Sequence, residues 1–331
     1  MTNSTDNGSN LGPGYVIAVV SAAILSTTAI FIRYLTQTYE MPALVLAFWR
    51  DSFVALSLLA ALGLMRSDRS RVKRQHLTYL IIYGFVLAIF NSLWTLSVAL
   101  NGAAVSTVLV YSSAGFTALL GRWLLRENLG WAKLVAVAVC LGGCVLVAEA
   151  FDPAVWNVNL VGILTGILSG LGYAIYSLMG RSASQRGLNA WTTVLYTFAF
   201  AAAFLLFFNL LPAAFGPLPG AATSLEELLW LGKAWVGWGI LALLAVGPTV
   251  AGFGLYNISL GYLPSSVANL ILTLEPAFTV VIAYLLLGEH LNGLQLGGSL
   301  MILSGVVFLR IYEGRMAKQI KLKPQTKWEG I

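Results

Sequence analysis

Charged residues are scarce in this chain of 331 residues. Asp, Glu, Lys and Arg together make up 10% of the sequence, whereas soluble domains contain about 25%. Hydrophobic residues make up 58%, and the mean hydropathy is +0.83. Nearly every stretch of about 20 residues is apolar enough to cross a bilayer. This composition excludes a water-soluble globular protein and indicates a polytopic membrane protein.

Cysteine and histidine are also rare, with two residues of each. Cys140 and Cys144 lie four residues apart in an apolar stretch, where they would share one helix face as small packing residues. His76 and His290 fall at the edges of predicted spans. We therefore predict no metal site, no cofactor and no catalytic Ser–His–Asp or Cys–His group, and hence no enzyme.

Apolar runs bounded by charged residues, Gly and Pro predict ten transmembrane helices. They are expected near residues 13–34, 43–65, 76–98, 103–125 and 130–149, and then near 159–181, 189–211, 234–260, 264–287 and 292–312. Continuous apolar stretches of this length favour helices over the alternating strands of a barrel. The predicted fold class is an all-α polytopic membrane protein.

The basic residues predict how the helices are oriented. With a cytoplasmic N-terminus, sixteen of the 19 Lys and Arg residues fall in cytoplasmic loops or the C-terminal tail. Only Arg33, Arg50 and Lys233 fall in the outer half. The positive-inside rule therefore predicts a protein of the inner plasma membrane with both termini in the cytoplasm. It also explains the net charge of +6, so no nucleic-acid partner is implied.

An ungapped register of 162 residues relates the two halves of the chain. It aligns Ser97 with Ser259, Phe116-Thr117 with Phe278-Thr279, Glu127 with Glu289 and Gly143 with Gly305. Each repeat would contain five helices, and because five is odd, the second repeat must lie upside down relative to the first. Inverted repeats are typical of secondary transporters, which bind substrate where the repeats meet.

The repeats divide the sequence into five regions. We expect a polar cytoplasmic N-terminus at 1–12, a first repeat at 13–149 and an extracytoplasmic linker at 150–158. A second repeat at 159–312 and a basic cytoplasmic tail at 313–331 follow. The N-terminal segment has no Lys or Arg, so the first apolar run is expected to be a retained span.

Two ionisable side chains stand out because charges inside spans are costly and commonly functional. Arg50 lies beside Asp51 in the second span. The two point about 100° apart, so they are not expected to pair with each other. Glu275 precedes Pro276 in the ninth span, where the proline predicts a kink. We predict gating or coupling roles for Arg50 and Glu275, with proton coupling at Glu275. The alternatives are an interfacial arginine and a glutamate that braces the kink.

Amphipathic aromatic and amide side chains lie several turns inside their spans, where each polar group needs a partner. They predict a cavity for a small amphipathic solute. The predicted lining residues are Trp49, Asn91, Trp94, Tyr111, Tyr173, Tyr176, Tyr256 and Asn257.

Three further features predict structural roles. Gly162, Gly166 and Gly170 form small-xxx-small steps that favour close helix packing. Glu127 and Glu289 stand just before a helix begins, and a helix N-terminus favours a carboxylate there. Pro248 predicts a second bend, in the eighth span.

Several motifs resemble the EamA family of the drug/metabolite transporter superfamily. The runs Tyr262–Ala268, Leu274–Phe278 and Leu287-Gly288-Glu289 resemble its second repeat, and Phe48-Trp49-Arg50 and Leu125-Arg126-Glu127 resemble its first. The resemblance implies a basket of spans one to four and six to nine around a central cavity, with spans five and ten as outer supports. Ser113-Ala114 stands where the second half has Glu275-Pro276.

The resemblance implies a secondary carrier that exports amino acids or similar small metabolites by alternating access. A uniport facilitator or channel for small amphipathic solutes, or a drug efflux carrier, is the alternative. The expected partners are a small-molecule substrate and the lipid bilayer. A monomer is preferred, because ten spans can form a complete pathway in one chain.

Overall fold

The computed structural model describes residues 11–64, 72–147, 160–210, 220–222, 224–287 and 293–322, and every regular element in these ranges is a helix. Within these described ranges, six helices are long and apolar enough to cross a membrane: Gly12–Thr38, Ala43–Leu64, Arg74–Leu100, Leu160–Gln185, Ala190–Leu210 and Trp235–Tyr262. Trp131–Val147 and Leu296–Tyr312 are shorter apolar helices. The expected all-α fold is confirmed. The predicted linker at 150–158, Glu289 and His290 lie outside the described residues.

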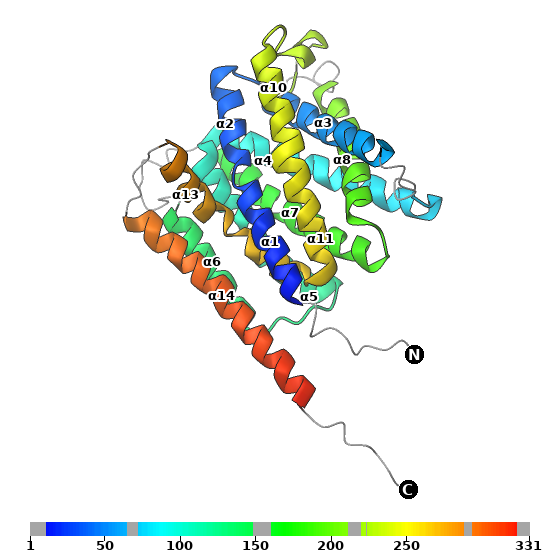
Figure 1. Cartoon of the computed structure of the whole chain (residues 1–331). Coiled ribbons are helices and arrows are strands. Elements are labelled where there is room, and N and C mark those ends of the chain that lie inside the picture. The colour runs from blue at the N-terminus through cyan, green and yellow to red at the C-terminus, as the bar shows by residue number, and fades with distance from the viewer. Residues whose placement is uncertain are drawn as a thin grey trace.

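The described part of the first half contains six α-helices, which Figure 1 shows in blue to green. They are α1 (Leu11–Leu25), α2 (Thr28–Thr38), α3 (Ala43–Leu64), α4 (Leu77–Tyr111), α5 (Ser113–Leu124) and α6 (Trp131–Val147). The short 3₁₀ turn η2 (Arg74–His76) precedes α4.

Helix α4 covers the third predicted span and the first part of the fourth, which continues in α5. Its 35 residues would extend about 52 Å if the helix were straight. Ser97 Oγ and Ser106 Oγ are nevertheless 2.9 Å apart, although nine residues of straight helix would separate them by about 13 Å. The chain therefore turns back between these two serines, and the arms on either side correspond to predicted spans three and four.

The second half begins with the long helices α7 (Leu160–Gln185) and α8 (Ala190–Leu210). The 3₁₀ turn η3 (Glu226–Leu229) and α10 (Trp235–Leu244) follow. The π-helical turn η4 (Ala245–Ala251) then joins α10 to α11 (Gly252–Tyr262). The last elements are α12 (Ser265–Leu272), α13 (Glu275–Leu287) and α14 (Gly293–Leu322). Helix α14 therefore continues ten residues beyond the predicted end of its span.

Helix breaks occur at equivalent positions in the two halves. Helix α5 begins at Ser113 and α13 begins at Glu275, and these two residues are aligned by the register of 162. The predicted kink at Pro276 is confirmed, but the first half breaks at the same place without a proline. At Pro248, where a bend was predicted, the helix contains the π-helical turn η4.

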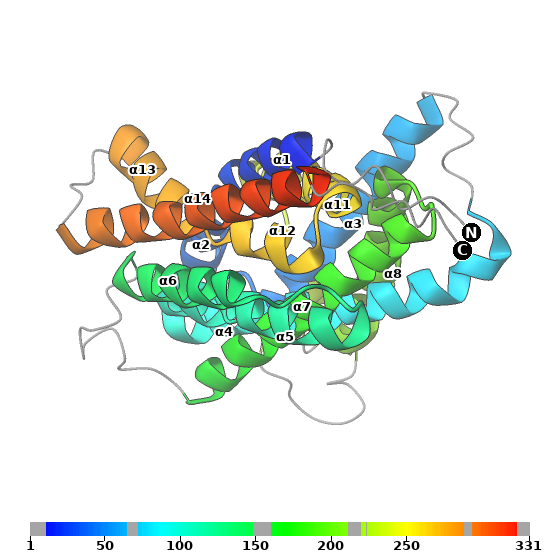
Figure 2. The ribbon, with the colours of Figure 1, turned by 90° about the horizontal axis from the view of Figure 1, so that it is seen from below.

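The last helices of the two halves, α6 and α14, pack against each other at the edge of the molecule (Figures 1 and 2). Trp131 near the start of α6 contacts Tyr312 of α14, with ring centroids 5.5 Å apart, whereas Gly298, early in α14, lies against Val147 at the end of α6. The two helices therefore run antiparallel. This agrees with the expectation that spans five and ten form an outer support.

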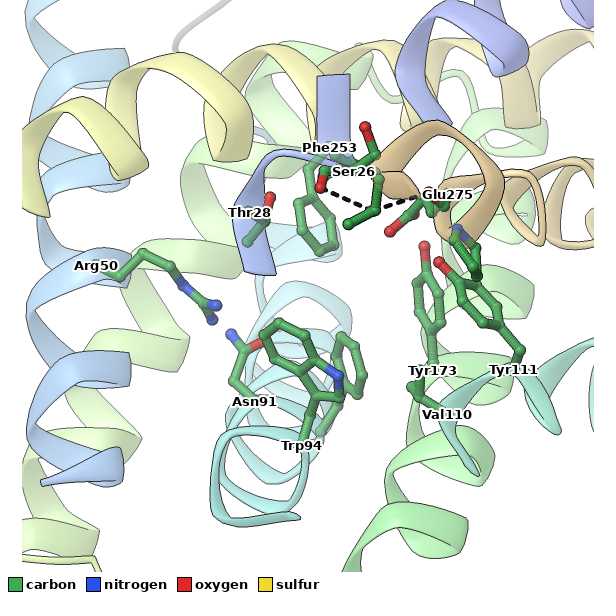
Figure 3. A pocket seen from close by; sticks show the side chains of 14 residues that line it. Ser26, Thr28, Arg50, Asn91, Trp94, Val110, Tyr111, Tyr173, Phe253 and Glu275 are labelled. Carbon is green, nitrogen blue, oxygen red and sulfur yellow. Dashed lines mark hydrogen bonds between the residues drawn. The ribbon is translucent and has the colours of Figure 1, made fainter. Parts of the chain in front are cut away.

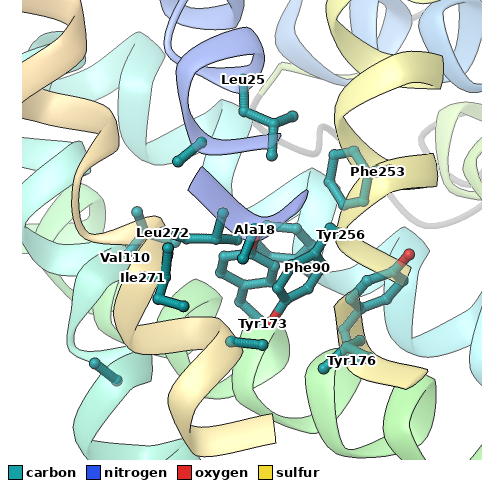
Figure 4. Packing of buried hydrophobic residues seen from close by; sticks show 14 of the residues in the cluster. Ala18, Leu25, Phe90, Val110, Tyr173, Tyr176, Phe253, Tyr256, Ile271 and Leu272 are labelled. Carbon is teal, nitrogen blue, oxygen red and sulfur yellow. The ribbon is translucent and has the colours of Figure 1, made fainter. Parts of the chain in front are cut away.

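Small residues let the central helices approach closely. An added Cβ on Gly166 of α7 would lie 2.7 Å from Leu109 Cδ1 on α4, and one on Gly170 would meet Ser112 Oγ. The packing role predicted for Gly166 and Gly170 is confirmed. Figure 4 shows the resulting core around Phe90, Tyr173, Tyr256 and Leu272. In a bilayer such close packing, rather than exclusion of water, supplies much of the attraction between helices.

Candidate functional site

A cavity lies where helices of the two halves meet, with about 650 Å³ of space that protein atoms do not fill, part of it open to solvent. Its walls come from both sides of the α1–α2 break, from the end of α4 just before the α4–α5 break, and from the start of α13 just after the α12–α13 break. The lining residues are Leu25, Ser26, Thr28, Arg50, Phe90, Asn91, Trp94, Val110, Tyr111, Tyr173, Phe253, Glu275, Pro276 and Thr279. Figure 3 shows Arg50 on one side of this cavity and Glu275 on the other.

Arg50 is held in place by its sequence neighbour. Its Nε donates a hydrogen bond to Asp51 Oδ1 at 3.1 Å, and Asn91 Nδ2 on α4 donates to Asp51 Oδ2 at 2.7 Å. The expectation that Arg50 and Asp51 do not pair is therefore wrong. Asp51 is fully buried, and a buried carboxylate needs a charged partner, so the long arginine side chain bends back to meet it.

Two polar atoms at the cavity have no hydrogen-bond partner within the described ranges. Arg50 Nη2 is one, although the Arg50 side chain is only 2% exposed. Thr28 Oγ1 at the start of α2 is the other. Buried polar atoms without a partner are rare in native structures, because each costs about 1–3 kcal/mol. Arg50 therefore reaches the cavity with donor capacity that Asp51 does not use.

Glu275 lies across the cavity, at the first residue of α13. The Thr279 hydroxyl is 3.0 Å from two backbone oxygens, those of Glu275 and Ser26. This hydroxyl therefore joins the α12–α13 break to the α1–α2 break. The hydroxyls of Tyr111 and Tyr173 point toward Glu275 in Figure 3, and Tyr111 is a hydrogen-bonding neighbour of the Glu275 carboxyl.

Aromatic rings form the apolar part of the wall. Phe90 on α4 stacks on Tyr173 on α7, with centroids 4.8 Å apart and planes 3° from parallel. Trp94 lies one turn beyond Phe90, and Phe253 enters from α11. The cavity therefore has an ionisable group on each of two sides and an aromatic surface between them.

Six of the ten residues predicted to form the site line this cavity: Arg50, Asn91, Trp94, Tyr111, Tyr173 and Glu275. The other four, which are Trp49, Tyr176, Tyr256 and Asn257, lie outside its lining. Their contacts explain why.

Tyr176, Tyr256 and Asn257 belong to a buried polar network behind the Phe90–Tyr173 stack. Asn257 Nδ2 donates to the Tyr176 hydroxyl at 2.8 Å, and the Tyr256 hydroxyl lies 2.7 Å from Ser177 Oγ. Asn269 Nδ2 donates to the same Ser177 oxygen, while its own Oδ1 accepts from Ser113. The network therefore connects α5, α7, α11 and α12. These side chains satisfy one another instead of facing the cavity.

Trp49 faces the outer elements of the second half. Its Nε1 donates to the Leu228 carbonyl at 2.6 Å, and its ring meets Trp238 edge-on with centroids 4.9 Å apart. Trp49 directly precedes Arg50 in the sequence. Because consecutive helical side chains diverge by about 100°, Trp49 points away from the cavity.

The α1–α2 break gave no Pro or Gly signal, and sequence reasoning missed it. Three consecutive residues with hydroxyl side chains lie at this break: Ser26, Thr27 and Thr28. Ser26 Oγ and Thr27 Oγ1 bond the carbonyls of Ala23 and Ile24, a local competition with helical bonding that bends helices. This hydroxyl run was the available signal for Ser26 and Thr28 as cavity residues.

Glu127 caps a helix, but not the one that follows it. Its carboxylate accepts hydrogen bonds from the backbone N–H groups of Ser265 and Ser266, at 2.7 and 3.2 Å, and from both serine hydroxyls. These residues begin α12 in the other half. The expected preference for a helix N-terminus is confirmed, whereas the next helix, α6, is not the partner.

Sequence comparison identifies the architecture. The EamA-like transporter family matches residues 12–148 and again residues 160–311. The chain belongs to the EamA-like transporter family. The repeated match shows that this EamA protein consists of two duplicated halves, and the family is one of multi-pass membrane transporters rather than enzymes. A small-molecule substrate follows from membership.

Curated relatives of this EamA protein are distant but cover nearly its whole length. An uncharacterized transporter of Archaeoglobus fulgidus is 25% identical over 89% of this chain and 95% of its own. A probable amino-acid metabolite efflux pump of Escherichia coli is 26% identical over 86% of this chain and 90% of its own. A protein of the same name from Salmonella typhimurium is 25% identical over the same shares.

A solved structure shares the fold of this EamA protein. It aligns with a TM-score of 0.69 over 90% of this chain and 97% of that chain, at 15% identity. At this identity the likeness shows the fold alone.

Proposed function

We propose that this EamA protein is a secondary carrier that exports amino acids or similar small metabolites by alternating access. The observation that carries the proposal is the cavity at the junction of the two halves, with Arg50 and Glu275 on opposite sides. Two relatives, from Escherichia coli and Salmonella typhimurium, are named as probable amino-acid metabolite efflux pumps. Substrate sites at the interface between repeats are typical of secondary transporters.

The proposal includes ten spans in two inverted repeats. The antiparallel packing of α6 on α14 supports inversion, because these helices end equivalent halves. Reciprocal contacts support it further: an added Cβ on Gly143 would meet Ile302, and one on Gly305 would meet Cys140. Each residue of the first pair is aligned with one of the second by the register of 162. A twofold axis perpendicular to both helices produces this pattern.

The basic end of the molecule is assigned to the cytoplasm of the inner membrane, with both termini on that side. Arg310 in the second half of α14 lies 4.2 Å from the ring of Tyr15 in α1. At the same end, Arg181 of α7 donates to the carbonyls of Leu260 and Gly261, and Arg186 covers Tyr79. Basic residues gathered at one end agree with the positive-inside rule.

Glu275 and Arg50 are assigned to coupling and gating. An acid inside a membrane can carry a proton through the transport cycle. Thr279 ties the Glu275 backbone to the α1–α2 break, so a change at the carboxyl has a route to helices of both halves. A single chain encloses the cavity, which supports a functional monomer.

The test is efflux of a labelled panel of amino acids and other metabolites from proteoliposomes, with and without an imposed pH gradient. Wild type and Glu275→Gln are compared. Saturable efflux that the gradient drives, and that the variant loses, supports proton-coupled export. Saturable efflux that is indifferent to both leaves a uniport facilitator. Preference for hydrophobic drugs over every amino acid in the panel favours the drug efflux alternative.

A further inference from the structure

The cavity has a cationic hydrogen-bond donor on one wall and an acidic group on the opposite wall. Arg50 is paired with Asp51 through Nε only, and its Nη2 has no partner within the described ranges. Glu275 lies on the opposite wall beside Tyr111. Among the lining residues, Arg50 is the only basic residue and Glu275 is the only acidic residue.

Resting on the proposed function, we propose that the substrate is a zwitterion bound in one orientation, with its carboxylate at Arg50 and Thr28 and its ammonium group at Glu275. A carboxylate has two oxygens that accept hydrogen bonds, and arginine donors match this geometry better than other side chains do. One oxygen would accept from Arg50 Nη2 and the other from the Thr28 hydroxyl. Both atoms lack a partner within the described part of the chain, and each would gain one on binding.

The second charged end follows from the surroundings of Glu275. An ammonium group donates hydrogen bonds in three directions, which suits a carboxylate flanked by tyrosine hydroxyls. Tyr111 and Tyr173 both direct their hydroxyls to this side of the cavity. The substrate ammonium would therefore lie between the Glu275 carboxyl and these oxygens.

The remaining wall selects what lies between and beside the two charges. Phe90, Trp94 and Phe253 present aromatic surface, and Leu25 and Val110 add aliphatic surface. This lining favours an α-amino acid with an apolar side chain over a polar metabolite. A solute without a hydrogen-bond acceptor at this position would leave Arg50 Nη2 unpaired, which is the more costly arrangement.

The test is competition in proteoliposomes that take up labelled L-leucine or L-phenylalanine by counterflow. Each amino acid competes with its own amide, which lacks the carboxylate, and with its N-acetyl derivative, which lacks the ammonium group. Wild type is expected to bind either derivative at least about 10-fold more weakly than the amino acid. If both derivatives compete as well as the parent amino acid does, the proposal is overturned.

Two variants locate the charges. Thr28→Val removes a hydroxyl that has no partner in the described structure, so it should weaken the amino acid several-fold and leave the amide unchanged. Glu275→Gln should abolish discrimination against the N-acetyl derivative while keeping discrimination against the amide. The matched control is Thr165→Val, whose hydroxyl bonds only carbonyls of its own helix and should change neither ratio.

The outcomes separate this inference from the proposed function. If wild type moves amino acids but neither variant changes the ratios, transport stands and the bound orientation is wrong. If Thr28→Val instead changes discrimination against the N-acetyl derivative, and Glu275→Gln changes discrimination against the amide, the substrate lies in the reverse orientation. The proposal then also fails. If wild type moves no amino acid, the proposed function itself fails.

Discussion

Cys140 of α6 and Ile302 of α14 are equivalent residues of the two halves, and they touch each other. The Cys140 sulfur lies 3.6 Å from the Ile302 carbonyl oxygen, across a sequence separation of 162. In the proposed inverted arrangement, a residue that contacts its own repeat counterpart lies on the twofold axis between the repeats. The α6–α14 pair is therefore centred on this contact, with Gly143 and Gly305 on either side of it.

Close packing around this axis predicts a strong effect of one added methyl group. An alanine Cβ at position 143 would lie 2.6 Å from Ile302 Cγ1 and 2.8 Å from the Gly298 carbonyl. Gly143→Ala should therefore destabilise the protein by about 1–3 kcal/mol, seen as a lower melting temperature in detergent. Gly115→Ala is the control, because no heavy atom lies within 4 Å of its added Cβ. Equal melting temperatures for the two variants would contradict the packing described.

The cap on α12 predicts a second effect on stability. Glu127 accepts four hydrogen bonds from Ser265 and Ser266, and Glu127→Gln replaces one charged oxygen with an amide donor. We expect a loss of about 1–2 kcal/mol, measured by thermal unfolding. Glu226→Gln, in the exposed turn η3, should change little. If Glu226→Gln lowers stability as much as Glu127→Gln does, the effect comes from the loss of a negative charge and not from the cap.

Tyr256 distinguishes the buried network from the cavity. The Tyr256 hydroxyl bonds Ser177 rather than lining the cavity. Tyr256→Phe should therefore cost about 1 kcal/mol of stability and leave the apparent substrate affinity near the wild-type value. Transport assays and melting curves of the same preparation measure both. A large fall in affinity with unchanged stability would return Tyr256 to the substrate site predicted from the sequence.

The orientation of the bundle can be read with cysteine labelling. In a background with Cys140→Ala and Cys144→Ala, Arg186→Cys and Lys233→Cys each introduce one exposed thiol. A membrane-impermeant maleimide should label position 233 in spheroplasts with an intact inner membrane. Position 186 should react only after that membrane is opened. The opposite pattern would invert the assignment of the cytoplasmic side.

Hydropathy and charge predicted the helical class and the lengths of the long spans, because membrane insertion depends on the same quantities. The proline after Glu275 predicted the break there, whereas no proline marked the equivalent break at Ser113. The α4 turn, by contrast, lies in a continuous helical assignment and is visible only from the Ser97–Ser106 contact.

The direction in which a side chain points was the part that sequence could not supply. Trp49 and Arg50 are adjacent and lie at the same depth, but only Arg50 reaches the cavity. Tyr173 and Tyr176 lie one turn apart on one helix, yet Asn257 binds the second and leaves the first at the wall. Both outcomes depend on neighbours from distant segments.

Alternating access is tested most directly by exchange across the bilayer. Proteoliposomes loaded with unlabelled amino acid are diluted into a trace of the same labelled compound, and uptake is followed over time. A carrier whose single cavity faces one side at a time should accumulate label transiently above equilibrium, and unlabelled substrate inside should accelerate uptake. Uptake that rises linearly with concentration, without acceleration or overshoot, would show a channel and contradict the proposed mechanism.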